Sequence, residues 1–168
     1  MTLPDKYSRI ERERRFLLSP MGKEVSALPR RVIVDHYIVG TDLRLRQVEN
    51  EDNKVFKLTK KSKLSPGHEQ ITTIYLSSEE YKLLSKLPAI VVSKSRHITN
   101  YEDVTIGIDI YGSGTEELWL AEVEFENTAS MDSFIMPLPY QSEVTGVDEF
   151  SGFALANRFG FLNRVEKN

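Results

Sequence analysis

Along most of the chain, apolar and polar residues alternate in short segments that are separated by Gly, Pro, Asn or Asp. This alternation is typical of strands with one face toward a core, because successive side chains point to opposite faces. It predicts strands at residues 9–17, 30–39, 43–48, 55–61, 69–76, 90–98, 104–111 and 118–125. Residues 9–17, taken alone, also fit an arginine-rich amphipathic helix. About eight closely spaced strands with few helices indicate an antiparallel sheet or barrel.

Few segments predict anything other than strand. Ser77, followed by acidic residues, resembles a helix N-cap, so we expect a short helix from there to about Leu87. Residues 64–67 predict a loop, and the Gly-Ser-Gly at 112–114 predicts a hairpin connection. Near the C-terminus, prolines indicate a loop and residues 148–161 predict a helix.

In an ordinary half-buried strand, alternation separates apolar from polar residues. Here charged residues at spacings of two or four gather on one face of each strand. The sets are Glu11 and Glu13 with Arg15, Arg44 with Arg46, Lys57 with Lys61, Lys94 with Arg96, and Glu122 with Glu124. The opposite faces of most of these strands are apolar. On the first strand the pattern is less regular, because Arg12 and Arg14 lie between Ile10 and Phe16.

Two architectures explain this segregation. A sandwich with a solvated outer face accounts for any single strand. A closed barrel with a charged interior and an apolar exterior covered by helices accounts better for the whole set, since each strand carries nearly one sign of charge. Acidic strands facing cationic strands would also satisfy the requirement that buried charges are paired. We therefore expect an α+β, mainly β fold: an eight-stranded antiparallel closed barrel with a few flanking helices.

Composition narrows the class of protein. The 168 residues predict a single domain, 1–168, and a net charge of −3 argues against binding a nucleic acid polymer. The sequence has no cysteine, which excludes disulfides, thiolate metal sites and cysteine nucleophiles. No apolar run is long enough for a signal core or membrane span, so we expect a cytoplasmic protein without a membrane partner. A homodimer is compatible with the sequence, but nothing in it demonstrates one.

The charged sets suggest their own chemistry. Paired carboxylates on one strand face suit Mg²⁺ or Mn²⁺, hard ions that prefer oxygen ligands and share them with substrate phosphates. Clustered Arg and Lys side chains suit phosphate, and several inward cations would repel one another without a highly charged anion such as a triphosphate. The three histidines lack metal-ligand spacing, and no nucleophile elbow or Walker-type phosphate loop is present.

The motifs together resemble the CYTH superfamily. ERERRFL at 11–17 is similar to its E-x-E-x-K strand, and LRLR at 43–46, Thr59-Lys60-Lys61, Lys94-x-Arg96, IDIY around Asp109 and AEVEFE at 121–126 follow in the family's order. A TG…F pattern at Thr145, Gly146 and Phe150 resembles its C-terminal region. The resemblance spans about residues 7–160 and implies a triphosphate tunnel, a barrel whose charged lumen binds triphosphates with a divalent metal.

The resemblance also implies residue roles. It makes Glu11, Glu13, Arg15, Glu122 and Glu124 catalytic, Arg44, Arg46, Lys57, Lys61, Lys94 and Arg96 substrate-binding, and Glu11, Glu13, Asp109, Glu122 and Glu124 metal ligands for Mg²⁺ or Mn²⁺. Three departures stand out. Arg15 replaces the signature lysine, Ile71 stands where the mid-chain acidic strand has a second acid after Glu69, and Asp5-Lys6 replaces the His-Phe pair of the cyclase branch.

The function expected from these features is metal-dependent hydrolysis of a small triphosphate, inorganic tripolyphosphate first. One alternative is an adenylyl cyclase or a phosphatase for nucleoside or thiamine triphosphates. Either would need a pocket for the organic group at one tunnel mouth, which the sequence does not identify. Another alternative is a binding module for polyphosphate or nucleotides that does not turn over. The sequence does not assign which carboxylate accepts the proton of the attacking water.

Overall fold

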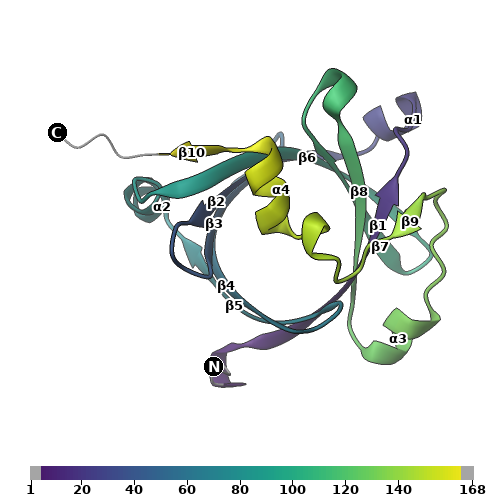
Figure 1. Cartoon of the computed structure of the whole chain (residues 1–168), viewed down its shortest axis with the longest axis horizontal. Coiled ribbons are helices and arrows are strands. Elements are labelled where there is room, and N and C mark those ends of the chain that lie inside the picture. Colours follow the sequence, from purple (N-terminus) through teal and green to yellow (C-terminus); the bar gives the residue numbers. More distant parts are fainter. Residues whose placement is uncertain (1–4, 164–168) are drawn as a thin grey trace.

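Eight antiparallel strands close into a barrel in the computed structural model, which describes residues 5–163 (Figure 1). They are β1 (Arg9–Leu18), β2 (Arg30–Ile38), β3 (Leu43–Glu49), β4 (Lys54–Ser65), β5 (His68–Leu76), β6 (Ala89–Tyr101), β7 (Val104–Tyr111) and β8 (Leu118–Phe125). Their order is β6-β2-β3-β4-β5-β1-β8-β7, and pairing of β7 with β6 closes the ring. The predicted closed, mainly β barrel is confirmed, and the helical alternative for 9–17 is wrong.

The charged faces of the strands point into the lumen. Strand register places Arg15 opposite Glu122 and Glu13 opposite Glu124, while Phe16 faces Ala121 on the other side of the same two strands. Because side chains alternate across a strand, this single register places Glu11, Glu13 and Arg15 of β1 and Glu122 and Glu124 of β8 on the lumen side. The charged faces are thus not the solvated outer face of a sandwich.

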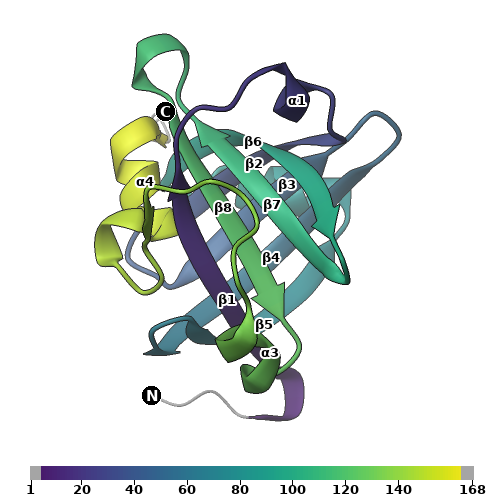
Figure 2. The same ribbon diagram turned by 90° about the vertical axis from the view of Figure 1, so that its right-hand side faces the viewer.

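The outer face of β1, β7 and β8 is apolar and covered. Phe16, Ile108 and Val123 belong to a buried cluster with Val25 and Met131, which come from α1 (Lys23–Ser26) and α3 (Thr128–Ser133). Figure 2 shows α1 and the segment that carries α3 lying over these strands. The main apolar core therefore lies outside the barrel wall, and the middle of the lumen is lined by polar groups.

Two outward arginines explain the irregular pattern of the first strand. Arg14 donates to both carboxylate oxygens of Glu143, at 2.8 and 2.7 Å, and to the carbonyls of Met131 and Phe134. Arg12 reaches Thr128 Oγ1 at 3.3 Å. Both side chains thus fasten the covering segment to β1, and neither takes part in the lumen.

A short C-terminal helix lies across one end of the barrel (Figures 1 and 2). The predicted helix over 148–161 is wrong in its bounds: a 3-10 turn, η3 (Asp148–Phe150), precedes α4 (Gly152–Phe159). Ser151 separates them because its backbone is extended, at φ −64° and ψ 151°, while its side chain accepts the Ala154 N–H and caps α4. Leu155 and Ala156 of α4 pack with Leu120 at this end of the lumen.

The remaining elements differ from the predictions mainly in length. Strand β4 continues to Ser65 by pairing with β5, so the predicted loop at 64–67 shrinks to a turn. The expected helix is α2 (Ser78–Leu84), with a capping box between Ser77 and Glu80. The helices α1 and α3 were not predicted, nor were the short elements η1 (Asp5–Tyr7), η2 (Gly114–Glu116), β9 (Ser142–Glu143) and β10 (Phe161–Asn163). Among residues 5–163, no helix has the length and apolarity needed to cross a bilayer.

The turn between β4 and β5 packs closely against β1 at Gly67. Gly67, at φ +72°, accepts the Glu13 N–H, and a Cβ there would lie 2.7 Å from the Glu13 carbonyl oxygen. Gly40 has a similar φ of +76° but nothing within 4 Å of its Cβ position. We expect Gly40→Ala to lower the free energy of unfolding by about 1 kcal/mol through backbone strain alone. Gly67→Ala should cost at least about 2 kcal/mol more because β1 must also shift. Urea unfolding of both variants measures this difference, and equal losses would contradict close packing at Gly67.

Candidate functional site

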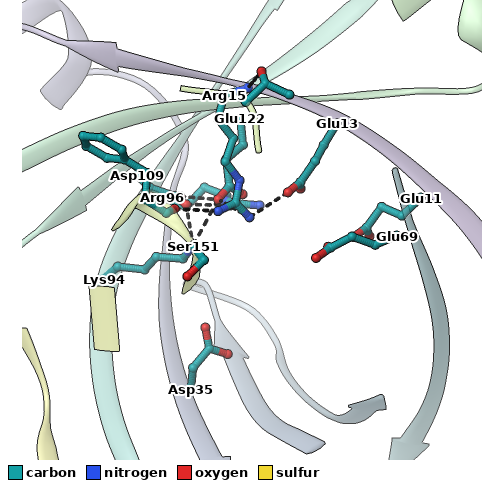
Figure 3. Close-up of polar contacts among 12 residues, drawn as sticks. Glu11, Glu13, Arg15, Asp35, Glu69, Lys94, Arg96, Asp109, Glu122 and Ser151 are labelled. Atoms are coloured by element: carbon teal, nitrogen blue, oxygen red, sulfur yellow. Dashed lines mark hydrogen bonds and ion pairs between the residues drawn. The ribbon is translucent and has the colours of Figure 1, made fainter. Parts of the chain in front are cut away.

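Most of the charged residues singled out in the sequence converge inside the barrel, and several of them are labelled in Figure 3. A narrow cavity of about 30 Å³ is lined by Glu11, Glu13, Arg15, Arg44, Arg46, Lys61, Lys94, Arg96, Glu122 and Glu124, together with Tyr37, Tyr111 and Gly152. Of the predicted site residues, Lys57 lies farther out along the tunnel and Asp109 lies behind the lining. The volume holds roughly one water molecule. A larger ligand therefore has to separate some of the ion pairs that fill the lumen.

Three cations converge on Glu122. Arg96 Nη2 donates to Glu122 Oε2, while Arg15 Nη2 and Lys94 Nζ lie 3.5 and 3.9 Å from Glu122 Oε1. Burial alone would raise the pKa of Glu122, but Lys94, Arg96 and Arg15 hold it well below its usual range. Arg15 of β1 and Lys94 and Arg96 of β6 thus form an anion-binding site, which the carboxylate of Glu122 occupies.

Asp109 holds two of these cations from behind. Its side chain is 0% exposed, and its carboxylate accepts from Arg96 Nε and Nη2 at 2.6 and 2.7 Å and from Lys94 Nζ. The Lys94 ammonium also donates to Tyr111 Oη at 3.0 Å. Gly107 leaves room for this arrangement, since a Cβ there would lie 3.2 Å from Arg96 Cδ and Nε. The predicted role of Asp109 as a metal ligand stays a prediction, and its contacts fit a residue that positions Lys94 and Arg96.

On the opposite wall, one lysine bridges two acids. Lys61 Nζ donates to Glu11 and, at 2.7 Å, to Glu69. Burial opposes the charge of Lys61, yet Glu13, Glu11 and Glu69 raise its pKa. Ile71, where a second acid was expected, is buried opposite both Lys61 and Arg9 in the strand register. This wall therefore carries one carboxylate fewer than the family pattern implies.

Arg15 links the lumen to the segment that closes one end of the barrel. Its Nη2 lies 2.7 Å from Glu13 Oε1, while its Nη1 donates to the Phe150 carbonyl at 2.8 Å. Its backbone N–H donates to Thr145 Oγ1 at 3.0 Å. A lysine could not make the Glu13 and Phe150 contacts together with the same geometry, because an ammonium is a single point and a guanidinium is a fork.

One buried acid was missed as a site residue in the sequence. Asp35 is 2% exposed, and its carboxylate accepts from Arg46 Nε and Nη2 at 2.6 and 2.8 Å, with Arg44 Nε 3.7 Å away. Burial opposes ionisation, but Arg46 and Arg44 lower the pKa of Asp35 far below its usual value. The available signal was its position on the same strand face as Arg31 and Tyr37. The sequence criterion was two or more charged residues on one strand face. Asp35 is a single acid among β-branched residues and does not meet it.

A divalent ion would find its best donors at Glu13 and Glu124. They are directly opposite on β1 and β8, where side chains are close enough to share one ion. Burial raises the pKa of Glu13, and the charges of Glu122 and Glu11 add to this although Arg15 opposes it. Glu124 has no ion pair within residues 5–163. That part of the chain holds no group of three or more such ligands at metal-binding spacing. Magnesium typically takes one or two carboxylates and completes its shell with water and phosphate, so the pair fits this ion.

Larger cavities flank the narrow centre on both sides. Beside α4 lies a space of about 250 Å³ whose walls include Tyr37, Leu43, Val147 and Phe153. Cavities of about 600 and 390 Å³ share Arg46, Lys57, Tyr75 and Glu124. The lumen is therefore accessible through two mouths of different chemistry.

Solved structures with this fold include the inorganic triphosphatase NE1496, at 22% identity and a TM-score of 0.54, with 87% of this chain and 93% of that chain covered. A candidate adenylate cyclase from Bacillus halodurans is 19% identical with a TM-score of 0.52 and coverage of 82% and 97%. A protein from Pyrococcus horikoshii is 18% identical with a TM-score of 0.52 and coverage of 73% and 82%. No protein-family model and no curated protein matches the sequence. At these identities the likeness shows the fold.

The Asp35–Arg46 pair gives a pH-dependent test of the site's framework. Asp35→Asn should lower the free energy of unfolding by about 3 kcal/mol at pH 7, because Arg46 remains buried without its counter-charge. The folded state depresses the pKa of Asp35 below its unfolded value of about 3.9, so its stabilisation is present above that pH and is lost as the pH falls further. Denaturant unfolding of both proteins should therefore show a gap that narrows below about pH 4. A gap independent of pH would contradict this origin.

Proposed function

We propose that this barrel, which has the fold of CYTH-type proteins, binds a small triphosphate in its lumen and hydrolyses it with a divalent metal ion. Inorganic tripolyphosphate is the simplest substrate of this class. The likeness to an inorganic triphosphatase supports the proposal at the level of the fold. The arrangement of charges within this chain's own lumen supports it at the level of the site.

The observation that carries the proposal is the convergence of Arg15, Lys94 and Arg96 on Glu122. Cations held in fixed positions by buried partners can stabilise charge that develops on a phosphoryl group, without the reorganisation that water requires. A phosphate oxygen offers the same acceptor chemistry as the carboxylate that occupies this position. Substrate binding would therefore exchange a protein carboxylate for phosphate at ready-made donors.

The balance of charges in the lumen supports joint binding of metal and phosphate. The cations Arg15, Arg46, Lys61, Lys94 and Arg96 are each paired with Glu11, Glu13, Asp35, Glu69, Asp109 or Glu122. A bare triphosphate would add several negative charges to this balanced interior and leave displaced carboxylates unpaired. When bound, Mg²⁺ or Mn²⁺ would neutralise negative charge and supply an activated water. Glu13 and Glu124 are the residues we propose to hold it. Glu11 and Glu122 are paired with Lys61 and Arg96, and they would become further ligands once the substrate separates these ion pairs.

The chain's own residues then divide the remaining work. Lys94, Arg96 and Arg15 bind and orient the phosphate nearest to Glu122, and Asp109 holds the first two in place. Lys61, Arg44 and Arg46 bind the rest of the chain of phosphates from the facing wall. A carboxylate of the Glu11–Glu13 or Glu122–Glu124 pair accepts the proton from the attacking water. For phosphoryl transfer such positioning and charge stabilisation supply most of the catalysis.

A triphosphate with an organic group is the second candidate substrate, and one cavity favours it. The cavity beside α4 adjoins the narrow centre, and the two share the lining residues Glu13, Arg15, Arg44 and Lys61. Its outer walls carry apolar and aromatic side chains next to hydroxyl and carboxylate groups, which suits a base or a ring. The sequence did not reveal this pocket because its walls come from three separate connections.

The assay is phosphate release from tripolyphosphate, ATP and thiamine triphosphate, each with Mg²⁺ and with Mn²⁺. We expect metal-dependent release from tripolyphosphate, abolished by a chelator and restored by the metal. Glu11→Ala, Glu13→Gln and Glu124→Gln should lower kcat/KM by about 100-fold or more, because each removes an oxygen that holds the ion or water.

Glu116→Gln is the matched control, since Glu116 is exposed in the β7–β8 connection and should retain wild-type rates. Thermal unfolding confirms that each variant is folded. Release only from ATP or thiamine triphosphate would favour the organic substrate, and cyclic AMP from ATP would identify a cyclase. Tight binding with no release under any condition would overturn the enzymatic proposal in favour of a binding module.

A further inference from the structure

At the mouth opposite α4, two pairs of like charges face each other across neighbouring strands. Arg31 of β2 is directly opposite Arg96 of β6, and Lys57 of β4 is directly opposite Arg46 of β3. Like charges in directly opposed positions destabilise a sheet. A barrel that carries two such pairs at one mouth therefore has a local excess of positive charge.

Only the inner member of each pair is neutralised. Arg96 is paired with Asp109 and Glu122, and Arg46 is paired with Asp35. Arg31 and Lys57 form no ion pair with any residue in the range 5–163, although the Lys57 ammonium lies 5.4 Å from the centre of the Tyr75 ring. The uncompensated charge thus belongs to the outer residues.

Arg31 and Lys57 border one cavity. Both line the space of about 390 Å³, together with Tyr75, Asn50 and Asn53, and its single acidic residue is Glu124. Lys57 precedes Lys61 by four residues on β4, which places it about 13 Å farther along the strand. A group held here would therefore lie outside the centre, where Lys61 and Arg15 contact their partners.

The mouth beside α4 does not show the same excess. There Lys63 Nζ donates to Asp148 at 2.7 Å, and Asp42 lines the cavity as well. Among the cations of residues 5–163 that line the two mouths, the ones without an ion pair are at the mouth of Arg31 and Lys57, where a phosphate chain that fills the lumen could continue outward.

We propose that Arg31 and Lys57 form an outer phosphate subsite, which binds a phosphoryl group of a linear condensed phosphate longer than three units. The proposal rests on the lumen holding a phosphate chain, as the proposed function requires. It extends the substrate class from triphosphate to longer chains that protrude through this mouth. Arginine and lysine suit this role. The guanidinium can donate two hydrogen bonds to one phosphate, and the ammonium adds a compact positive charge beside its other oxygens.

The test is calorimetric binding of tripolyphosphate and tetrapolyphosphate to the full chain in the presence of Mg²⁺. The Glu11→Ala variant serves as the parent protein for these measurements, so that turnover is slow. We expect tetrapolyphosphate to bind more tightly. The double variant Arg31→Gln/Lys57→Gln should weaken tetrapolyphosphate by about 10- to 100-fold and tripolyphosphate by less than about 3-fold. Lys63→Gln, at the other mouth, should change neither by more than about 3-fold. Unchanged thermal unfolding establishes that the variants are folded.

Three results would overturn the subsite: tetrapolyphosphate that does not bind, binding no tighter than that of tripolyphosphate, or an equal loss of both ligands in the double variant. An equal loss of both ligands would show that Arg31 and Lys57 attract any polyphosphate by their charge alone and do not contact a fourth phosphate. A protein that discriminates chain length in this way but releases no phosphate with metal would contradict the proposed hydrolysis and leave the subsite standing.

Discussion

The barrel can keep a charged interior because nearly every cation in it meets a carboxylate from another strand. Arg96 with Asp109, Lys61 with Glu11 and Arg46 with Asp35 each join two strands across the wall. An unpaired charge in such a place would cost several kcal/mol, so the pairs are a condition of folding as well as a feature of the site. Apolar packing does not replace them, since the main apolar core lies outside the wall.

The same pairing divides the carboxylates into two kinds. Asp109 and Asp35 are buried behind the cations and keep their side chains in position whatever the lumen contains. Glu13, Glu122 and Glu124 line the lumen itself, where the proposed anion or metal ion would compete for their contacts. With buried carboxylates fixing the cations and lumen carboxylates free to exchange partners, the barrel would remain stable while it binds the proposed ligand.

The sequence predicted the wall better than its ends. Alternation with a period of two places Arg44, Arg46, Glu122 and Glu124 on one face without any tertiary information, because register commits a whole strand at once. Asp35 escaped notice since its importance depends on a partner eleven residues away on another strand. The bounds of α4 and the cavity beside it escaped notice for a related reason. Ser151 interrupts a segment that reads as continuously helical, and the cavity joins connections that are distant in the chain.

The first and the last strands of the ring are neighbours, with consequences for how the protein assembles. β1 pairs with β8 from Arg12 opposite Phe125 onward. During synthesis β1 therefore emerges long before the strand with which it pairs. Such long-range pairing is slow, because the entropy of closing a long loop precedes any gain from contact. Until that closure, the arginines and glutamates of the lumen remain hydrated at little cost. We expect desolvation of the charged set to accompany closure of the seam between β1 and β8, so that folding is completed and the site is created in the same step.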